Sequence, residues 1–257
     1  MALLHSCVNN GGPFSLIKLG HVPQLDQEIL LSEDATVALS HWQAMAGEVL
    51  TVVDPEATAY RARITCFEPG KASCVPFQRL MKPVESQQIR IEVYQSLPDK
   101  KCFELMLQKL SELGVTRIIP FESQQSATLV EWDAQQEILH DWPKVICSAS
   151  RHCHRAMLPE LLPVHTFAEA LTCASSTELK MILHESDALW TFTEGVGSFR
   201  PQSIALLVGP EGGFTQDEIE QAQAEGFLPI SLGPRTLRAE TAAIVAATLA
   251  QSYLGDL

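Results

Sequence analysis

The amino-acid sequence predicts an α/β protein with a parallel β-sheet, preceded by a small β-rich domain. The first third of the chain contains short β-rich segments separated by turn signals such as Glu68-Pro69-Gly70, a spacing typical of a small barrel. Beyond it, apolar strands alternate with helical segments, which is the pattern of a parallel sheet covered on both faces. The segment Lys82–Ser86 is the best linker, so we expect a barrel domain over residues 1–85 and an α/β domain over residues 86–257.

Four strands are expected in the first domain, at residues 27–32, 48–53, 59–67 and 71–80. In and just after them lies a basic island within an otherwise acidic chain, formed by Arg61, Arg63, Lys71, Arg79, Lys82, Arg90, Lys100 and Lys101. Such an island is either a nucleic-acid-facing surface or a solvated face of hairpins, because Lys and Arg side chains are mostly exposed in any protein. The charge pattern leaves both interpretations open.

The second domain is expected to alternate strands and helices to its end. Amphipathic spacing predicts a helix closed by Gly114, and Thr215 with Glu218 forms a capping box that starts another. The expected strands are residues 89–97, 116–121, 179–185, 203–209 and 228–233. The expected helices are residues 101–114, 133–153, 216–225 and 240–253.

Three loops follow the late strands of this sheet, at residues 184–186, 209–213 and 232–241. Ligands of parallel sheets bind at the carboxyl ends of the strands, so these loops are the candidate site. The Gly209–Gly213 turn before a helix has the geometry of a phosphate cradle but lacks the glycine and lysine motifs of one. Its Glu211 would repel a phosphate by roughly 4 kcal/mol at about 4 Å, so we expect a neutral or cationic ligand.

Composition narrows the function classes. A net charge of -13 argues against indiscriminate nucleic-acid binding, and seven scattered cysteines fit a reducing cytoplasm. No apolar run approaches the length of a membrane span, and no hydrolase motif is present. The run Cys147–Arg155 carries His152, Cys153 and His154 but no C-x-x-C, so we expect no metal site. Arg151 and Arg155 share a helix face that meets either an anion or solvent.

The combination "GPEGGFTQDEIEQA" and "GFLPISLGPRTLRAETA" strongly resembles the C-terminal signature of the RsmE family, SPOUT-class methyltransferases that act on 16S ribosomal RNA. The resemblance extends upstream through "LPDKKCFELMLQKLSELGVTRIIPF", "WPKVICSASRHCHRAMLPEL" and "ILHES", and so covers roughly residues 85–257. It implies a trefoil-knotted parallel sheet preceded by a PUA-like β-barrel that helps to hold RNA. It also implies a cytoplasmic homodimer that methylates N3 of a uridine (uridine 1498) in the small ribosomal subunit.

The resemblance also implies roles for single residues. S-adenosylmethionine is expected in a bent form between the three loops, against Leu183, His184, Glu185, Gly209, Pro210, Glu211, Gly212, Leu232, Gly233, Leu237, Thr241 and Ala242. Its sulfonium cation explains why Glu211 is tolerated. Arg238 and Glu240 are expected to position or deprotonate the uracil, since a carboxylate base and a nearby cation both favour attack by N3. RNA contacts are expected at Arg61, Arg63, Arg79 and Arg155.

The chain departs from the family pattern in its expected RNA contacts and keeps the cofactor loops. No arginine-and-aromatic motif precedes Lys18, and Gln43 stands where the family has an arginine. The run Arg151-His152-Cys153-His154-Arg155 keeps only the final arginine of the corresponding family segment. Two alternatives therefore stay open: methylation of another base or a ribose 2'-hydroxyl, and a ribosome-binding factor without catalysis.

Overall fold

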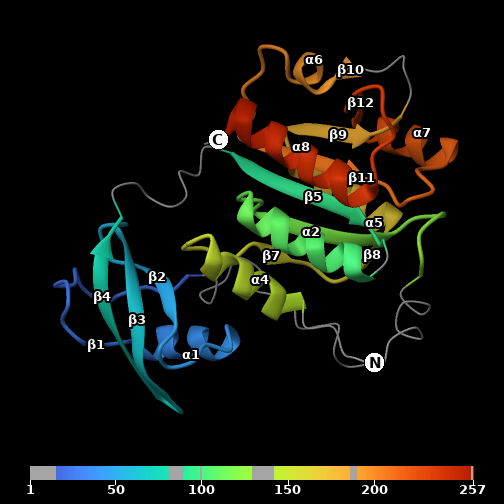
Figure 1. The fold of residues 1–257 in the computed structure, drawn as a ribbon. Coiled ribbons are helices and arrows are strands. Elements are labelled where there is room, and N and C mark those ends of the chain that lie inside the picture. The colour runs from blue at the N-terminus through green and yellow to red at the C-terminus, as the bar shows by residue number, and fades with distance from the viewer. Residues whose placement is uncertain (1–15, 81–88, 99, 129–141, 186–189, 256) are drawn as a thin grey trace. The chain divides into compact units, whose positions relative to one another are not determined.

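The computed structural model describes residues 16–80, 89–98, 100–128, 142–185, 190–255 and 257. The described chain forms two compact units (Figure 1): an N-terminal unit of residues 16–80 with 142–160, and a C-terminal unit of residues 89–128 with 161–257. Residues 142–160 thus belong by their contacts to the N-terminal unit, whereas the sequence analysis placed them in the second domain. The expected linker Lys82–Ser86 lies outside the described residues.

The N-terminal unit contains an antiparallel sheet with the strand order β1-β4-β3-β2. Its strands are β1 (Ile29–Leu30), β2 (Val49–Val53), β3 (Ala59–Glu68) and β4 (Lys71–Arg79), one for each expected segment. Side chains alternate along β3, where Tyr60, Ala62 and Ile64 are buried and the residues between them are more exposed. Closure of this sheet into a barrel stays a prediction.

Two helices complete the N-terminal unit. Helix α1 (Glu33–His41) was not expected, although Ser32 caps it by accepting a hydrogen bond from the Ala35 N–H at 3.2 Å. Helix α4 (Trp142–His152) is the described part of the helix expected over residues 133–153. The expected start of that helix, residues 133–141, lies outside the described residues.

The C-terminal unit is built on the expected parallel sheet. The strand order is β10-β12-β9-β11-β5-β6-β7, and β8 also pairs with β6. The expected strands are β5 (Arg90–Ser96), β6 (Arg117–Glu122), β9 (Leu179–Leu183), β11 (Ser203–Val208) and β12 (Leu228–Ser231), and β7 (Glu160–Leu161), β8 (His165–Thr166) and β10 (Trp190–Thr191) are short additions. Pairing along β5, β6, β9, β11 and β12 is parallel throughout, which confirms the α/β class. Every residue of the central strand β11 is buried, which explains its continuous apolar run.

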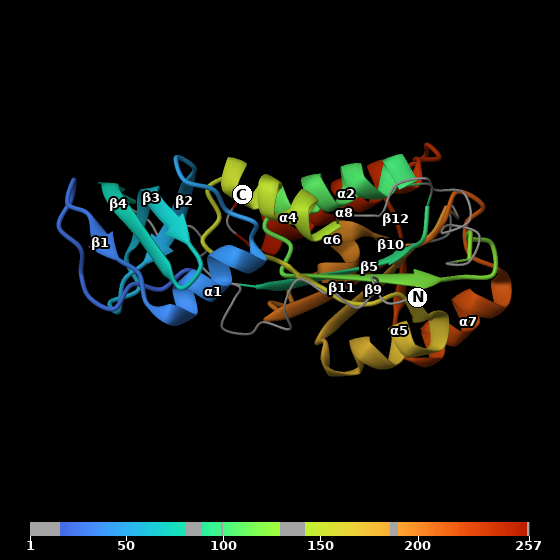
Figure 2. The ribbon, with the colours of Figure 1, turned by 90° about the horizontal axis from the view of Figure 1, so that it is seen from below.

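Helices cover both faces of this sheet (Figure 2). Helices α2 (Lys100–Glu112) and α8 (Ala239–Leu254) pack against each other on one face, with α6 (Phe192–Val196) beside α8. Helices α5 (Phe167–Cys173) and α7 (Gln216–Ala224) lie on the other face, and a 3-10 turn (Ala174–Ser176) follows α5. In the described part of the chain, no helix combines the length and the apolar character that crossing a membrane requires.

A buried carboxylate ties together the amino ends of the strands. The side chain of Glu92 is 1% exposed, and its Oε2 accepts hydrogen bonds from the Tyr94 hydroxyl at 2.8 Å and the Thr177 hydroxyl at 3.0 Å. Its Oε1 lies 2.9 Å from Nε of Arg90 and 3.7 Å from a guanidinium nitrogen of Arg117. Burial and the Glu92 charge raise the pKa of Tyr94, so the tyrosine stays a hydrogen-bond donor.

We expect Glu92→Gln to lower the free energy of unfolding by about 2 kcal/mol, because hydrogen bonds to a charged group are worth about 1.5–3 kcal/mol each. The arginines are partly exposed, so water can compensate for part of their loss. Urea denaturation measures the effect. Glu225→Gln, at an exposed carboxylate, is the control and should change stability by less than about 0.5 kcal/mol. Equal losses in the two variants would remove the stabilising role from Glu92.

Candidate functional site

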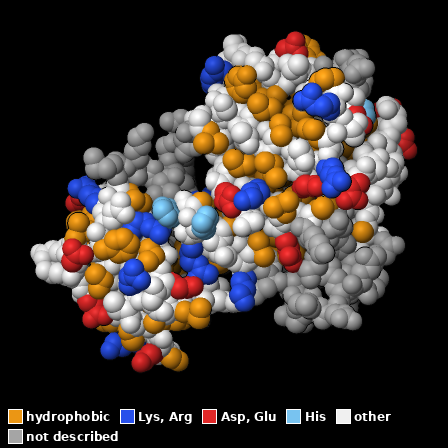
Figure 3. Space-filling model, in the orientation of Figure 1, with side chains coloured by type: hydrophobic (Ala, Val, Ile, Leu, Met, Phe, Trp, Pro, Cys, Tyr) orange, Lys and Arg blue, Asp and Glu red, His pale blue; other side chains and the backbone are white. Residues whose placement is uncertain are grey.

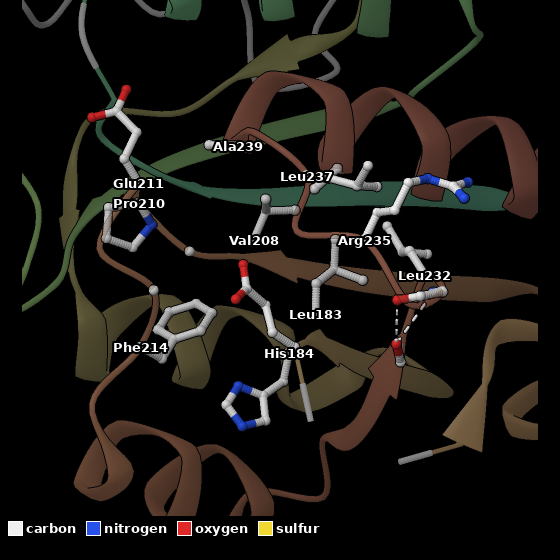
Figure 4. A pocket seen from close by; sticks show the side chains of 16 residues that line it. Leu183, His184, Val208, Pro210, Glu211, Phe214, Leu232, Arg235, Leu237 and Ala239 are labelled. Atoms are coloured by element: carbon white, nitrogen blue, oxygen red, sulfur yellow. Dashed lines mark hydrogen bonds between the residues drawn. The ribbon is translucent and has the colours of Figure 1, made fainter. Parts of the chain in front are cut away.

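The three expected loops meet at one edge of the parallel sheet. Strands β12, β9 and β11 are neighbours in that order, so the loops that leave their carboxyl ends lie side by side. Together they form a pocket (Figure 4). It is lined by Leu183, His184, Glu185, Val208, Gly209, Pro210, Glu211, Gly213, Phe214, Ser231, Leu232, Gly233, Arg235, Leu237, Ala239 and Ala242.

Glycines shape the loop after β11. A Cβ on Gly209 would lie 3.1 Å from the ring of Phe214, which is buried and stacked on Phe121 with ring centroids 6.4 Å apart. Gly213 has a φ of +75°, a conformation that L side chains rarely adopt, and its N–H donates to the carbonyl of Pro210 at 2.9 Å. The chain therefore turns tightly over the Phe214 ring.

The capping box expected at the start of α7 is confirmed and fixes the end of this loop. Thr215 accepts from the Glu218 N–H, and the Glu218 carboxylate accepts from the Thr215 N–H at 2.9 Å. Glu218 is buried, and its other oxygen accepts the Gln124 N–H at 2.8 Å. One carboxylate thus joins the helix start to the segment that follows β6.

Hydrogen bonds also hold the loop after β12. The Ser231 hydroxyl lies 3.2 Å from both the N–H and the carbonyl oxygen of Gly233, whose φ is +118°. The Thr236 hydroxyl donates to a carboxylate oxygen of Glu185 at 3.4 Å, which connects this loop to the one after β9. These hydrogen bonds therefore fix the shape of this side of the pocket wall.

The pocket combines an apolar floor with a mixed rim. Figure 4 shows Leu183, Val208 and Leu237 gathered at its centre, while Glu211 extends its carboxylate away from them. Among the lining residues, Arg235 is the basic side chain and Glu185 and Glu211 are the carboxylates. This balance fits the expected neutral or cationic ligand better than a phosphate.

The structure brings together all the expected cofactor residues except Gly212 and Thr241, which do not line the pocket. Gly212 contacts Gln125 instead, since a Cβ there would lie 2.4 Å from the Gln125 amide oxygen. Sequence reasoning missed Val208, Gly213, Phe214, Ser231, Arg235 and Ala239 as lining residues. Val208 and Ser231 are the last residues of their strands, so counting each loop from one residue earlier would have found both. Ser186, in the expected first loop, lies outside the described residues.

The two expected catalytic residues flank the pocket wall at the start of α8. Arg238 is the exposed N-cap residue of this helix, and Glu240 is half-buried in its first turn. Ala239 between them lines the pocket, as does Ala242 one turn further on. Arg238 and Glu240 are therefore adjacent to the wall, although neither belongs to the residues that line it.

The four expected RNA contacts do not share one surface. Arg61 and Arg63 lie on the face of β3 opposite to Tyr60, whereas Arg79 pairs with Tyr60 and so points to the same face as Tyr60. Arg155 is buried. The described residues contain no group of three or more His, Cys, Asp or Glu side chains that could hold a metal ion.

Comparison with known proteins identifies relatives of this chain. The model of an RNA methyltransferase domain matches residues 85–251. A ribosomal RNA small subunit methyltransferase E from Buchnera aphidicola is 30% identical over 185 residues, 70% of each chain. A crystal structure of that enzyme from Neisseria gonorrhoeae with S-adenosyl methionine shares 28% identity at a TM-score of 0.68, covering 94% of this chain and 98% of that one. A methyltransferase from Legionella pneumophila with bound cofactor SAM gives 30% identity, the same TM-score and the same coverage.

The parallel sheet, its pocket at the strand ends and the matched domain define an RNA methyltransferase domain. Within that class, the chain belongs to the ribosomal RNA small subunit methyltransferase E family, RsmE.

Proposed function

We propose that this protein is an S-adenosylmethionine-dependent methyltransferase of 16S rRNA that methylates N3 of a uridine in the small ribosomal subunit, at uridine 1498. The names of the relatives support the rRNA substrate, and the two similar structures with bound S-adenosylmethionine support the cofactor. The uridine and its N3 position rest on the RsmE resemblance alone.

The observation that carries the proposal is the pocket itself. Its floor is apolar, and the described residues of its lining combine the carboxylates of Glu185 and Glu211 with Arg235 and include no lysine of the kind that a nucleotide-phosphate site holds. S-adenosylmethionine fits these residues because it joins an adenine and an amino-acid tail to a sulfonium cation and has no phosphate. Leu183, Val208 and Leu237 would bury the adenosine against apolar surface.

The bound cofactor supplies an activated methyl group on a positively charged sulfur. The uracil N3 must lose its proton before it can accept a methyl group, and Glu240 is the carboxylate we assign to take that proton. Arg238 would stabilise the negative charge that spreads onto the uracil oxygens.

Larger-scale features of the proposal follow the family. We propose that the parallel sheet is a SPOUT-type trefoil knot, that residues 1–85 form a PUA-like barrel, and that the enzyme is a cytoplasmic homodimer. Arg61, Arg63, Arg79 and Arg155 are the proposed RNA-binding residues, with 16S rRNA inside the small subunit as the partner. A net charge of -13 favours the assembled subunit over free RNA, because few phosphates would be neutralised.

The decisive experiment is methyl transfer from labelled S-adenosylmethionine to small subunits that lack the modification, followed by mass spectrometry of the nucleosides. We expect 3-methyluridine at a single site. A different methylated base or a 2'-O-methyl nucleoside would assign another RNA methyltransferase activity. Cofactor binding with no transfer to any subunit would favour a ribosome-binding factor without catalysis.

A further inference from the structure

One arginine of the N-terminal unit is enclosed without a partner. A terminal guanidinium nitrogen of Arg61, Nη1, is inaccessible to solvent and has no hydrogen-bond partner among the described residues. Burial lowers the pKa of this guanidinium, although an arginine stays charged at any physiological pH. A buried donor without a partner costs free energy, so this nitrogen of Arg61 is available to an acceptor that the described residues do not supply.

The segment after α4, which contains His154, packs on the face of the sheet that carries Arg61. Thr51 is the cross-strand partner of Arg61 and therefore lies on the same face. The Thr51 hydroxyl donates to the carbonyl of His154 at 2.9 Å, which places His154 over this face. Burial and the positive charges of Arg61 and His152 lower the pKa of the His154 imidazole. These three side chains are thus close enough to repel one another when they are charged.

The nearby carboxylate is already engaged elsewhere. Glu48 forms an ion pair with Arg151 and accepts the Met45 N–H at 2.9 Å. Arg63 lies on the same face of β3 as Arg61 and donates to the Gly47 carbonyl at 3.2 Å. The face around Arg61 therefore carries excess positive charge, and Figure 3 shows histidine side chains next to Lys and Arg side chains on the N-terminal unit.

The backbone of His154 is left-handed just after the end of α4. Its φ is +68°, and the Arg155 N–H closes the end of α4 by donating to the Ser150 carbonyl at 2.9 Å. Helices most often place glycine at such a position, and another residue there costs roughly 1 kcal/mol.

We propose that Arg61, His152 and His154 form a site for a single phosphate group, and that the phosphate is a phosphodiester of the RNA substrate. The guanidinium offers paired N–H donors to two phosphate oxygens, and each imidazole carries one N–H donor in its neutral form. This inference rests on the proposed function for the source of the phosphate, but its test does not need methyl transfer. It adds His152 and His154 to Arg61, one of the four arginines proposed to bind RNA.

The test measures binding of the full-length protein to small ribosomal subunits, with S-adenosylmethionine affinity and thermal unfolding measured alongside. Arg61→Gln should weaken subunit binding about tenfold and reduce the salt dependence by about one phosphate contact, with cofactor affinity unchanged. Lys71→Gln removes one positive charge from an exposed site on the same sheet and is the matched control. It should change binding less than about twofold, and equal losses in both variants would reduce the site to general electrostatics.

A second variant separates binding from folding. His154→Gly removes the imidazole but suits the left-handed backbone, so it should raise the unfolding temperature while it weakens subunit binding several-fold. Unchanged binding in this variant would overturn the proposal. A second titration tests whether the ligand is free phosphate instead of an RNA phosphodiester. Inorganic phosphate is added alone while the histidine NMR signals are followed. Saturation by millimolar phosphate that leaves subunit binding unchanged would identify free phosphate as the ligand and refute the RNA assignment.

Discussion

Gly209→Val is expected to reduce the affinity for S-adenosylmethionine by at least about 100-fold, equivalent to about 2.7 kcal/mol. The Cβ alone would lie 3.1 Å from the Phe214 ring, closer than most real Cβ contacts, and the branched side chain adds two methyl groups. Phe214 packs against Phe121 and Phe167, with ring centroids 6.4 Å and 6.0 Å away, and these contacts oppose its displacement. Either the ring or the glycine loop must shift, and both line the pocket.

Isothermal titration calorimetry measures this loss directly, and thermal unfolding shows whether the fold persists. Gly20→Val is the matched control, because a Cβ on Gly20 meets no atom within 4 Å and its backbone is not left-handed. Wild-type affinity in the folded Gly209→Val protein would show that the cofactor does not use this pocket. Gly212→Val is a weaker probe, since Gly212 contacts the flexible Gln125 side chain and does not line the pocket.

The sequence predicted those elements whose pattern is long enough to read. Strand β11 is a continuous apolar run, and α7 begins directly after the first residue of a capping box and has nine residues. Helices α5 and α6 begin with the same capping box, Thr166 with Glu169 and Thr191 with Glu194, yet both were missed. They have seven and five residues, too few for an amphipathic period to be visible, although their start signals were present.

The pocket was largely predictable because strand ends and glycine turns are local features of the chain. The place of Phe214 in the pocket could not be predicted, since this loop residue packs against Phe121 of β6, which is distant in the sequence. The arginines were harder still. Which face of the sheet Arg61 and Arg79 take follows from strand register, where Arg61 pairs with Gln78 and Arg79 with Tyr60. The amino-acid composition gives the number of arginines but does not show which face of the sheet each one lies on.

Glu240→Gln is expected to lower the turnover number about 100-fold and to change cofactor affinity less than about twofold, as loss of a general base does. Glu240 stands beside the pocket wall without lining it, so the cofactor should not depend on its charge. Single-turnover methyl transfer to small subunits, with saturating cofactor, measures the chemical step. An unchanged rate would remove Glu240 from the mechanism.

The control must account for the helix dipole, because Glu240 lies in the first turn of α8, where a negative charge is also structurally favourable. Asp217→Asn removes the corresponding charge from the first turn of α7, at an exposed site outside the pocket. If both variants lose only stability, by a similar amount of about 0.5 kcal/mol, Glu240 acts as a helix-start residue and not as a base. If only Glu240→Gln loses turnover, and its rate recovers as the pH rises toward the ionisation of free uracil, then the missing function is proton removal. That recovery separates a base from a positioning residue, since alkaline solvent can remove a proton but cannot restore a lost orientation.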